Sequence, residues 1–199
     1  MIGNLRETTR QNSQQDWLKT NLARFTRLLQ CQRDITAVSK MLLSELATLI
    51  NAQHGVFYMM DETVADNPRL KLLSAYAFKE RKSLVSEWRV GEELVGQCAY
   101  EKQRILLTNV PSDYIEITSG LGGSKPQNIL VLPIVFENKI KAVIEIASFT
   151  LFSQIHQAFL DQLGEFIGVV LNTIETNLRT EDLLKQSQTL SEELQSQQE

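Results

Sequence analysis

The sequence predicts an α+β fold in which the strands of an antiparallel β-sheet are preceded and followed along the chain by long helices. Residues 17–172 contain nearly all of the aromatic residues and β-branched runs. Within that part, two pairs of apolar, strand-like segments are each joined by a polar stretch, which is the pattern of β-hairpins. The segments before and after them repeat apolar residues every three to four positions, as amphipathic helices do.

The first helix is expected from about Asp16 to Ile50, because this stretch contains neither glycine nor proline. Its apolar residues fall on two tracks. One track follows Leu18, Leu22, Phe25, Leu29, Gln32, Thr36, Ser39 and Leu43, and the other follows Ile35, Val38, Leu42, Leu46 and Leu49. Two apolar stripes imply two partners. We expect the sheet of the same domain to be one and a helix of another subunit to be the other.

The middle of the chain predicts the strands. A hairpin joins 54–60 to 70–78 through a loop that contains Asp66-Asn67-Pro68. A second hairpin joins 128–136 to 139–149 with a turn at Glu137-Asn138-Lys139. The elements expected between the hairpins are a short strand at 86–90, a short helix at 94–102, a strand at 104–108 and a loop at 112–125.

The last helix is expected to begin after Ser153, whose hydroxyl is a good N-cap. Its track Ile167, Leu171, Ile174, Leu178 is followed, after a step of five, by Leu183, Leu190 and Leu194. Such a phase break is typical of a stutter in a coiled coil. A thin leucine stripe flanked by Glu, Gln and Lys cannot bury itself alone, so it predicts a parallel dimeric coil. The alternative is a frayed tail.

These patterns divide the chain into a linker and first helix (1–30), a domain (31–172) and a signalling coiled-coil helix (173–199). They also predict a homodimer formed by parallel helices. The expected interface residues are Leu18, Leu22, Phe25, Leu29, Ile167, Leu171, Ile174, Leu178, Leu183, Leu190 and Leu194.

Composition and charge exclude several classes of protein. The net charge is −4 and offers no basic excess for a phosphate backbone, so no nucleic-acid partner is expected. No apolar run is long enough for a signal peptide core or a bilayer span, which predicts a soluble, cytoplasmic segment without membrane contact. Two separate cysteines, Cys31 and Cys98, suit a reducing compartment. Two histidines without ligand spacing predict no metal site.

Several local segments resemble the GAF domain family over roughly residues 30–175. They are the helix entrance 91–99 (GEELVGQCA), the strand and turn 105–111 (ILLTNVP), the closing hairpin 128–146 (NILVLPIVFENKIKAVIEI) and the helix start 152–163 (FSQIHQAFLDQL). The resemblance implies long N- and C-terminal helices on one face of the sheet, with loops and short helices on the other.

A narrower resemblance concerns the flanks. Residues 16–34 and 176–199 are similar to the segments around GAF domains in bacterial, cyanobacterial-type multi-sensor hybrid histidine kinases. This implies an excerpt of a two-component signalling protein whose catalytic domains lie outside it, and it leaves open whether the whole protein is attached to a membrane.

The resemblance also implies a small-ligand site between the sheet and the loops over its open face. Position and strand alternation predict eight candidate ligand-binding residues: Tyr76, Phe78, Cys98, Thr108, Asn109, Asp113, Tyr114 and Glu145. Glu145 is the only carboxylate in the apolar strand 142–147, so it lies on a solvent edge or is buried and paired. For the tyrosines and threonine the alternative is ordinary strand packing.

No cofactor is expected. A covalent bilin in this family needs a cysteine in the covering loop, and residues 110–130 have none. The Asn138-Lys139 pair lacks the rest of the cyclic-nucleotide pattern, and neither His54 nor His156 is placed as a haem ligand. The family's methionine sulfoxide reductases use cysteines in that same loop.

The chain also lacks nucleophile-elbow and phosphate-loop motifs, so a non-catalytic sensory or relay module is the leading hypothesis. The alternatives are a dimerisation spacer without a ligand and a thiol redox sensor.

Overall fold

The computed structural model describes residues 2–30, 32–63, 67–77, 86–111, 114–119 and 122–196, with side chains from residue 7 onwards. The helices are α1 (Ile2–Gln30), α2 (Ile35–Ile50), α3 (Glu93–Glu101) and α4 (Gln154–Ser196). The strands are β1 (His54–Asp61), β2 (Arg69–Tyr76), β3 (Glu87–Arg89), β4 (Ile105–Thr108), β5 (Ile117–Ser119), β6 (Gly122–Ser124), β7 (Asn128–Phe136) and β8 (Lys139–Ser148).

Six strands form one antiparallel sheet in the order β3-β2-β1-β8-β7-β4. The two expected hairpins are its β1–β2 and β7–β8 pairs, and β8 also pairs with β1 to join them. The second hairpin turns at Glu137 and Asn138, which both have positive φ as a tight hairpin turn requires. Both hairpins are confirmed.

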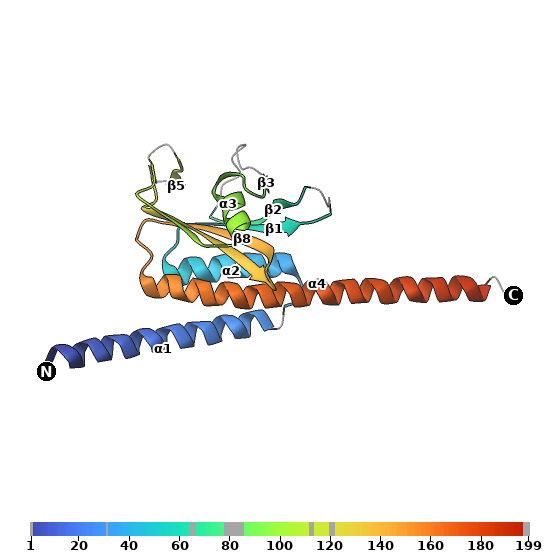
Figure 1. The fold of residues 1–199 in the computed structure, drawn as a ribbon, viewed down its shortest axis with the longest axis horizontal. Coiled ribbons are helices and arrows are strands. Elements are labelled where there is room, and N and C mark those ends of the chain that lie inside the picture. Colours follow the sequence, from blue (N-terminus) through green and yellow to red (C-terminus); the bar gives the residue numbers. More distant parts are fainter. Residues whose placement is uncertain are drawn as a thin grey trace.

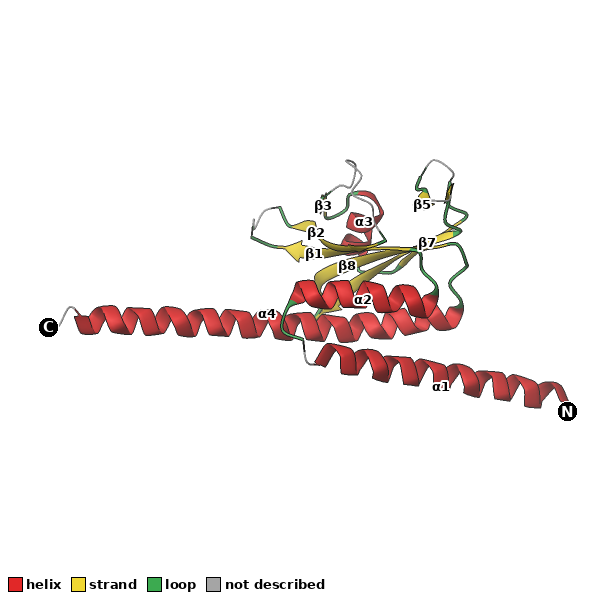
Figure 2. Cartoon of the chain, turned by 180° about the vertical axis from the view of Figure 1, so that it is seen from behind, coloured by secondary structure: helices red, strands yellow, loops and turns green. Residues whose placement is uncertain are grey.

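The sheet has helices on one side and loops with a short helix on the other (Figure 1). Helices α2 and α4 cover one face, whereas α3 and the small β5–β6 pair lie over the opposite face (Figure 2). Helix α1 runs beside α4 on the side away from the sheet. This arrangement confirms the predicted α+β fold with its long helices on one face.

The N-terminal helical segment differs from the expectation of one continuous helix. It consists of α1 and α2, which run in opposite directions, and the described residues 32–34 before α2 are not helical (Figure 1). The Asp34 carboxylate accepts hydrogen bonds from the backbone N–H groups of Thr36 (3.0 Å) and Ala37 (3.3 Å). Asp34 is therefore the N-cap of a new helix. The chain reverses there, and α1 lies along α4.

A second difference concerns residues 112–125, which were expected to form only a loop. Ile117–Ser119 and Gly122–Ser124 pair there as the two antiparallel strands β5 and β6. Both strands have only three residues, and most of their side chains are exposed. Because they bury little apolar surface, the apolar pattern on which the prediction relied is missing.

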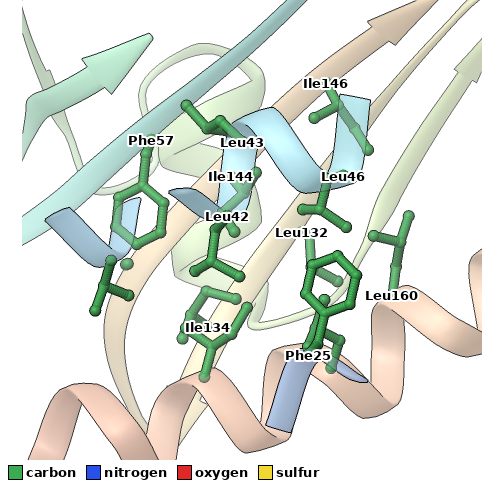
Figure 3. Packing of buried hydrophobic residues seen from close by; sticks show 14 of the residues in the cluster. Phe25, Leu42, Leu43, Leu46, Phe57, Leu132, Ile134, Ile144, Ile146 and Leu160 are labelled. Carbon is green, nitrogen blue, oxygen red and sulfur yellow. The ribbon is translucent and has the colours of Figure 1, made fainter. Parts of the chain in front are cut away.

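A helix-face core fills the space between the sheet and α1, α2 and α4, and Figure 3 shows part of it. We use this name for the buried residues Phe25, Leu29, Val38, Leu42, Leu43, Leu46, Ile50, Ala52, Phe57, Leu130, Leu132, Ile134, Ala142, Ile144, Ile146, Phe152, Phe159, Leu160, Leu163, Ile167, Leu171 and Ile174. The Phe25 and Phe159 rings meet edge to face, with centroids 5.4 Å apart. This contact fastens α1 to α4.

The helix-face core corrects part of the predicted dimer interface. Five of the predicted residues are at most 4% exposed in the single chain, because they pack between its own helices and sheet. They are Phe25, Leu29, Ile167, Leu171 and Ile174. Leu18 and Leu22 are partly buried against the same core. In this conformation these seven side chains serve the domain itself.

The other four predicted interface residues lie on the part of α4 that projects beyond the domain. Leu178, Leu183, Leu190 and Leu194 are 51–59% exposed, and residues 176–196 are exposed throughout. Helices α1 and α4 project from opposite ends of the domain (Figures 1 and 2). Within the described ranges, no helix is long and apolar enough to cross a membrane.

Candidate functional site

Strand β8 presents different side chains to the two faces of the sheet. Ile144 and Ile146 point into the helix-face core. Val143 and Ala147 point to the other face, and strand alternation puts Glu145 there with them. We call the buried residues on that side the α3-face cluster: Val56, Tyr58, Leu70, Val95, Cys98, Ala99, Val110, Ile129, Val131, Ile140, Val143 and Ala147.

Glu145 lies in the middle of the sheet, with Val56 of β1 opposite it on one side and Val131 of β7 on the other. Its side chain is partly exposed, although both neighbours on its face, Val143 and Ala147, are buried. Among the described residues, no hydrogen bond or ion pair to its carboxylate is present. Burial alone raises the pKa of Glu145 to about 7.

Tyr58 is an aromatic residue on β1, the strand beside Glu145. It pairs with Val143, two residues from Glu145, so the two side chains are diagonal neighbours on one face. Burial raises the pKa of the Tyr58 hydroxyl; the nearby Trp88 side chain opposes this rise, and the Glu145 charge adds to it. The sheet thus places an acid and a phenol side by side.

Trp88 lies on β3, at the edge of the sheet, and packs against the α3-face cluster. Its indole Nε1 is buried and has no hydrogen-bond acceptor among the described residues. The Trp88 side chain nevertheless interacts with the Tyr58 hydroxyl and lowers its pKa. Buried N–H groups without a partner are uncommon in native proteins, so this donor needs an explanation.

Cys98 lies on the inner side of α3 and is fully buried. Its Sγ donates a hydrogen bond to the backbone oxygen of Val131 at 3.7 Å. Burial, together with the charges of Glu101 and Glu145, raises the pKa of the thiol to about 12. The sulfur is therefore protonated at neutral pH, which opposes nucleophilic or redox chemistry because the thiolate is the reactive form.

Tyr114 approaches the same face from the segment between β4 and β5. It is 45% exposed, and its pKa is raised by partial burial and by the charges of Glu145 and Glu93. Three of the described side chains, Tyr58, Cys98 and Tyr114, thus lie within the electrostatic range of Glu145.

Tyr76 does not lie at this site, which corrects the prediction for that residue. It packs against the helix-face core and faces α2 together with the Gly55 position. The reason is a β-bulge: Phe57 pairs with Ser74, but Tyr58 pairs with Leu72. The extra residue in β2 reverses which side chains face which side of the sheet.

Thr108 and Asn109 are also absent from the site. Both are exposed at the end of β4. Thr108 lies on the same face of the sheet as Leu106, which packs against the helix-face core. Asn109 has a positive φ, and its backbone N–H donates to the oxygen of Gln127 at 3.1 Å. Phe78 and Asp113 lie outside the described residues, as does Cys31. Of the eight predicted ligand residues, the structure brings together Glu145, Cys98 and Tyr114.

Two residues of the site were not predicted from the sequence, Tyr58 and Trp88. Tyr58 could have been found by pairing the two central strands, since it lies on the same face as Glu145. Trp88 is in a strand of only three residues, too short to show an alternation.

Of the two histidines, His54 lies on the same face of the sheet as Glu145, since it pairs with Ala147, two residues along β8, whereas His156 lies on the helix side. His54 begins β1, where burial lowers its pKa and the backbones of Ala77 and Tyr76 act in the opposite direction. The His156 ring lies 5.5 Å from the Trp17 ring between α4 and α1, and burial lowers its pKa. Within the described part of the chain, no three His, Cys, Asp or Glu side chains converge as metal ligands would.

The sheet order, with a helix layer on one face and a short helix and a small strand pair over the other, defines the class of fold. Residues 32–172 match the sequence model of the GAF domain, and the chain belongs to this family. No curated protein matches the chain.

Solved structures show the same fold. The GAF domain of an Acinetobacter phosphoenolpyruvate-protein phosphotransferase has a TM-score of 0.63 at 16% identity and covers 83% of this chain and 96% of its own. The corresponding domain from Coxiella burnetii gives 0.65 at 14% identity, with coverage of 80% and 95%.

A free methionine-R-sulfoxide reductase from Neisseria meningitidis, solved with its substrate, gives a TM-score of 0.61 at 15% identity, with coverage of 78% of this chain and 89% of its own. At such identities the likeness shows the fold alone. Regulatory domains and an enzyme are therefore both among its structural relatives.

Proposed function

We propose that this chain is a non-catalytic sensory or relay module of a signalling protein. It binds a small ligand over the α3-face cluster and passes a change in packing to α4. The observation that supports this most directly is the Glu145 carboxylate in the middle of the sheet, for which the described residues provide no ion pair. A domain that served only as a spacer would fill this face with matched side chains.

Strand β8 offers a short path from the ligand face to the helix. Glu145 alternates with Ile144 and Ile146, whose side chains belong to the helix-face core. A ligand that shifts Glu145 therefore shifts residues that pack against the helices. Since packed cores resist continuous deformation, a small shift selects between discrete arrangements.

Helix α4 is held closely to the closing hairpin. Lys141 Nζ of β8 lies 2.7 Å from Glu175 Oε2 of α4. At Gly168 the helix approaches β7 so closely that a Cβ atom would lie 2.2 Å from the Val135 carbonyl oxygen. Movement of β7 and β8 is thus transmitted to α4 rather than absorbed by a loose contact.

The output is proposed to leave through the projecting end of α4. Its exposed leucines suit a parallel coil with a second copy, and their phase break between Leu178 and Leu183 offers two registers. A ligand would bias these registers through its difference in affinity for them. The flanking segments support a cytoplasmic position within a two-component histidine kinase.

Two alternatives remain distinct from this proposal. A thiol redox sensor would need a reactive sulfur, and Cys98 is buried and protonated. The reductase relatives make an enzyme a second candidate, but Cys98 is the only cysteine among the described residues. These properties favour a binding role over thiol chemistry.

Native mass spectrometry of the purified chain tests the proposal. We expect about twice the chain mass of 22.6 kDa, with a small molecule retained or acquired from a metabolite mixture. A ligand-free dimer that binds nothing would favour the spacer, and a monomer at micromolar concentration would contradict the dimer. Turnover of methionine sulfoxide would establish an enzyme instead.

A further inference from the structure

We infer that two copies of the chain contact each other along one unbroken surface of α4, which begins on the domain at Phe166 and Val169 and continues to Leu194. We call this surface the heptad stripe. The inference rests on the proposed function, whose parallel dimer used only the leucines of the projecting end. It adds the full contact surface and the register in which the two helices meet.

The heptad stripe follows steps of three and four residues in strict alternation. On the domain and just beyond it, its members are Phe166, Val169, Thr173, Thr176 and Thr180. On the projecting end they are Leu183, Ser187, Leu190 and Leu194. This is the spacing of the contact positions in a two-stranded coiled coil, and it continues from the domain to the projecting end without a break.

The stripe is open to a partner where α4 still lies on the domain. Val169 is 48% exposed, although its neighbours Ile167 and Leu171 are fully buried. Val169 also lies about 100° around the helix from Gly168, which is pressed against the carbonyl group of Val135. The stripe therefore faces away from the sheet. Beyond the domain, its threonines and leucines are exposed as well.

The threonines in the middle of the stripe are prepared for an apolar contact. The hydroxyls of Thr173, Thr176 and Thr180 each donate to the backbone oxygen four residues earlier, at 2.8 Å. Because each O–H donor is already satisfied within its own helix, a partner need only pack against the methyl group. A β-branched residue at the Thr180 position, followed by leucine at Leu183, also favours two strands over three or four.

The charges of the projecting end lie off the stripe. The heptad positions that face away from a partner carry four of them, Glu181, Asp182, Lys185 and Glu192. From 165 to 191, the positions that flank the stripe carry two charges, the exposed Glu165 on the domain and Arg179 on the projecting end. Like charges therefore do not face each other. A two-fold axis places each stripe residue opposite its own copy, so a second copy of this chain matches the stripe along its whole length.

Of the two registers proposed for α4, the described conformation presents the one that uses the heptad stripe. The other track passes through Ile167, Leu171 and Ile174, which are buried in the helix-face core. It reaches solvent only at Leu178, about 160° around the helix from Thr176. A dimer through that track would have to withdraw α4 from the core, whereas a dimer through the heptad stripe leaves the core intact.

Disulfide crosslinking of the full chain tests this inference. The background is Cys31→Ala, and the remaining Cys98 is fully buried and stays unreacted. Single cysteines replace four residues of the stripe, in the variants Thr173→Cys, Thr176→Cys, Thr180→Cys and Ser187→Cys. The rate of dimer formation under mild oxidation is read from non-reducing gels.

Two variants off the stripe complete the set. Thr189→Cys is the matched control, because Thr189 is exposed and its hydroxyl donates to the backbone oxygen of Lys185 at 3.0 Å, as the stripe threonines do to theirs. Leu178→Cys reports on the other track. We expect the four stripe variants to crosslink at least about tenfold faster than both, because only opposed cysteines come within disulfide range.

Three results would overturn the inference. Faster crosslinking at Leu178 than at Thr176 and Thr180 would assign the contact to the other track. Crosslinking at Ser187 alone would confine the contact to the projecting end, and a rate at Thr189 equal to that of the stripe would show random collision. Native mass spectrometry tests the proposed function separately, because a dimer that binds a ligand but crosslinks through Leu178 contradicts only the heptad stripe.

Discussion

Lys141 Nζ lies 2.7 Å from Glu175 Oε2, and this ion pair joins the last strand of the sheet to the long C-terminal helix. The pair lies where α4 begins to leave the domain, since Ile174 is the last buried residue of that helix. It therefore marks the boundary between the part of α4 held by the sheet and the part that projects.

Breaking this pair should have a small effect on stability. Glu175 is 36% exposed and Lys141 18%, so solvent screens the attraction and each single substitution, Lys141→Gln or Glu175→Gln, should cost about 1 kcal/mol or less. The double variant should cost less than the sum of the two single variants. Urea unfolding of all four proteins gives the coupling energy, and simple additivity would show that the contact contributes nothing.

Glu145 should make the folded state less stable as pH rises. Its pKa is about 7 in the folded chain and about 4.5 when exposed, so the folded state binds more protons between these values. The contribution of Glu145 to stability should be largest below about pH 4.5, fall by up to about 3 kcal/mol towards pH 7, and then stay level.

The check on Glu145 is urea unfolding at several pH values, with Glu145→Gln compared with the parent chain. The advantage of the Gln variant should grow between about pH 4.5 and about pH 7, since Gln does not titrate. Glu165→Gln should show the pH profile of the parent. Parallel profiles for Glu145→Gln and the parent would contradict the raised pKa.

The bulge in β2 explains why part of this site could not be predicted from the sequence. In β8 the alternation is regular, so Glu145 lies on the opposite face of the sheet from Ile144 and Ile146. It fails for Tyr76, because one extra residue near Leu73 reverses the faces of β2. A bulge depends on pairing with another strand, and a single strand's sequence does not show it.

For the helices too, the local sequence pattern predicts some features and misses others. The hairpins and the start of α4 were predicted because local alternation and the Ser153 cap determine them; the His156 N–H donates to Ser153 Oγ at 3.3 Å. The break before α2 was missed, although Asp34 is a good N-cap, because apolar periodicity continues across it. Whether an apolar stripe contacts the same chain or a second copy depends on this reversal.

Cys98 should resist chemical labelling in the folded protein. It is fully buried, and its pKa is raised to about 12, so little thiolate is present at neutral pH. In a Cys31→Ala background, iodoacetamide should modify Cys98 at least about a hundredfold more slowly in buffer than in urea. Similar rates in both conditions would revive a thiol-based function.

Two glycines of α4 form a matched pair for testing its contact with the sheet. At Gly168 an added Cβ would lie 2.2 Å from the Val135 carbonyl oxygen, so the helix or strand must move. At Gly164 the nearest atoms are side-chain carbons at 3.5 Å or more, which is ordinary contact. Gly168→Ala should destabilise the chain by about 1–3 kcal/mol, as overpacking does.

Gly164→Ala is the control for that prediction. Alanine is favoured over glycine within a helix by up to about 1 kcal/mol, so this variant should be neutral or more stable. The midpoint temperature of thermal unfolding should therefore fall for Gly168→Ala. It should rise or stay unchanged for Gly164→Ala. Equal shifts would show that α4 is not seated closely on β7. If the contact also transmits the signal, Gly168→Ala should uncouple ligand binding from α4.

The leucine stripe of α4 should determine the oligomeric state. Leu183, Leu190 and Leu194 are 54–59% exposed and follow one track, so replacing all three with Gln removes the predicted coil contact without touching the domain core. We expect light scattering to show a shift from about twice the chain mass towards 22.6 kDa. Leu184, 60% exposed, lies about 100° around the helix from Leu183. Leu184→Gln should therefore leave the dimer intact. An equal loss of dimer in Leu184→Gln and in the triple variant would show that general surface hydrophobicity, and not a specific stripe, holds the copies together.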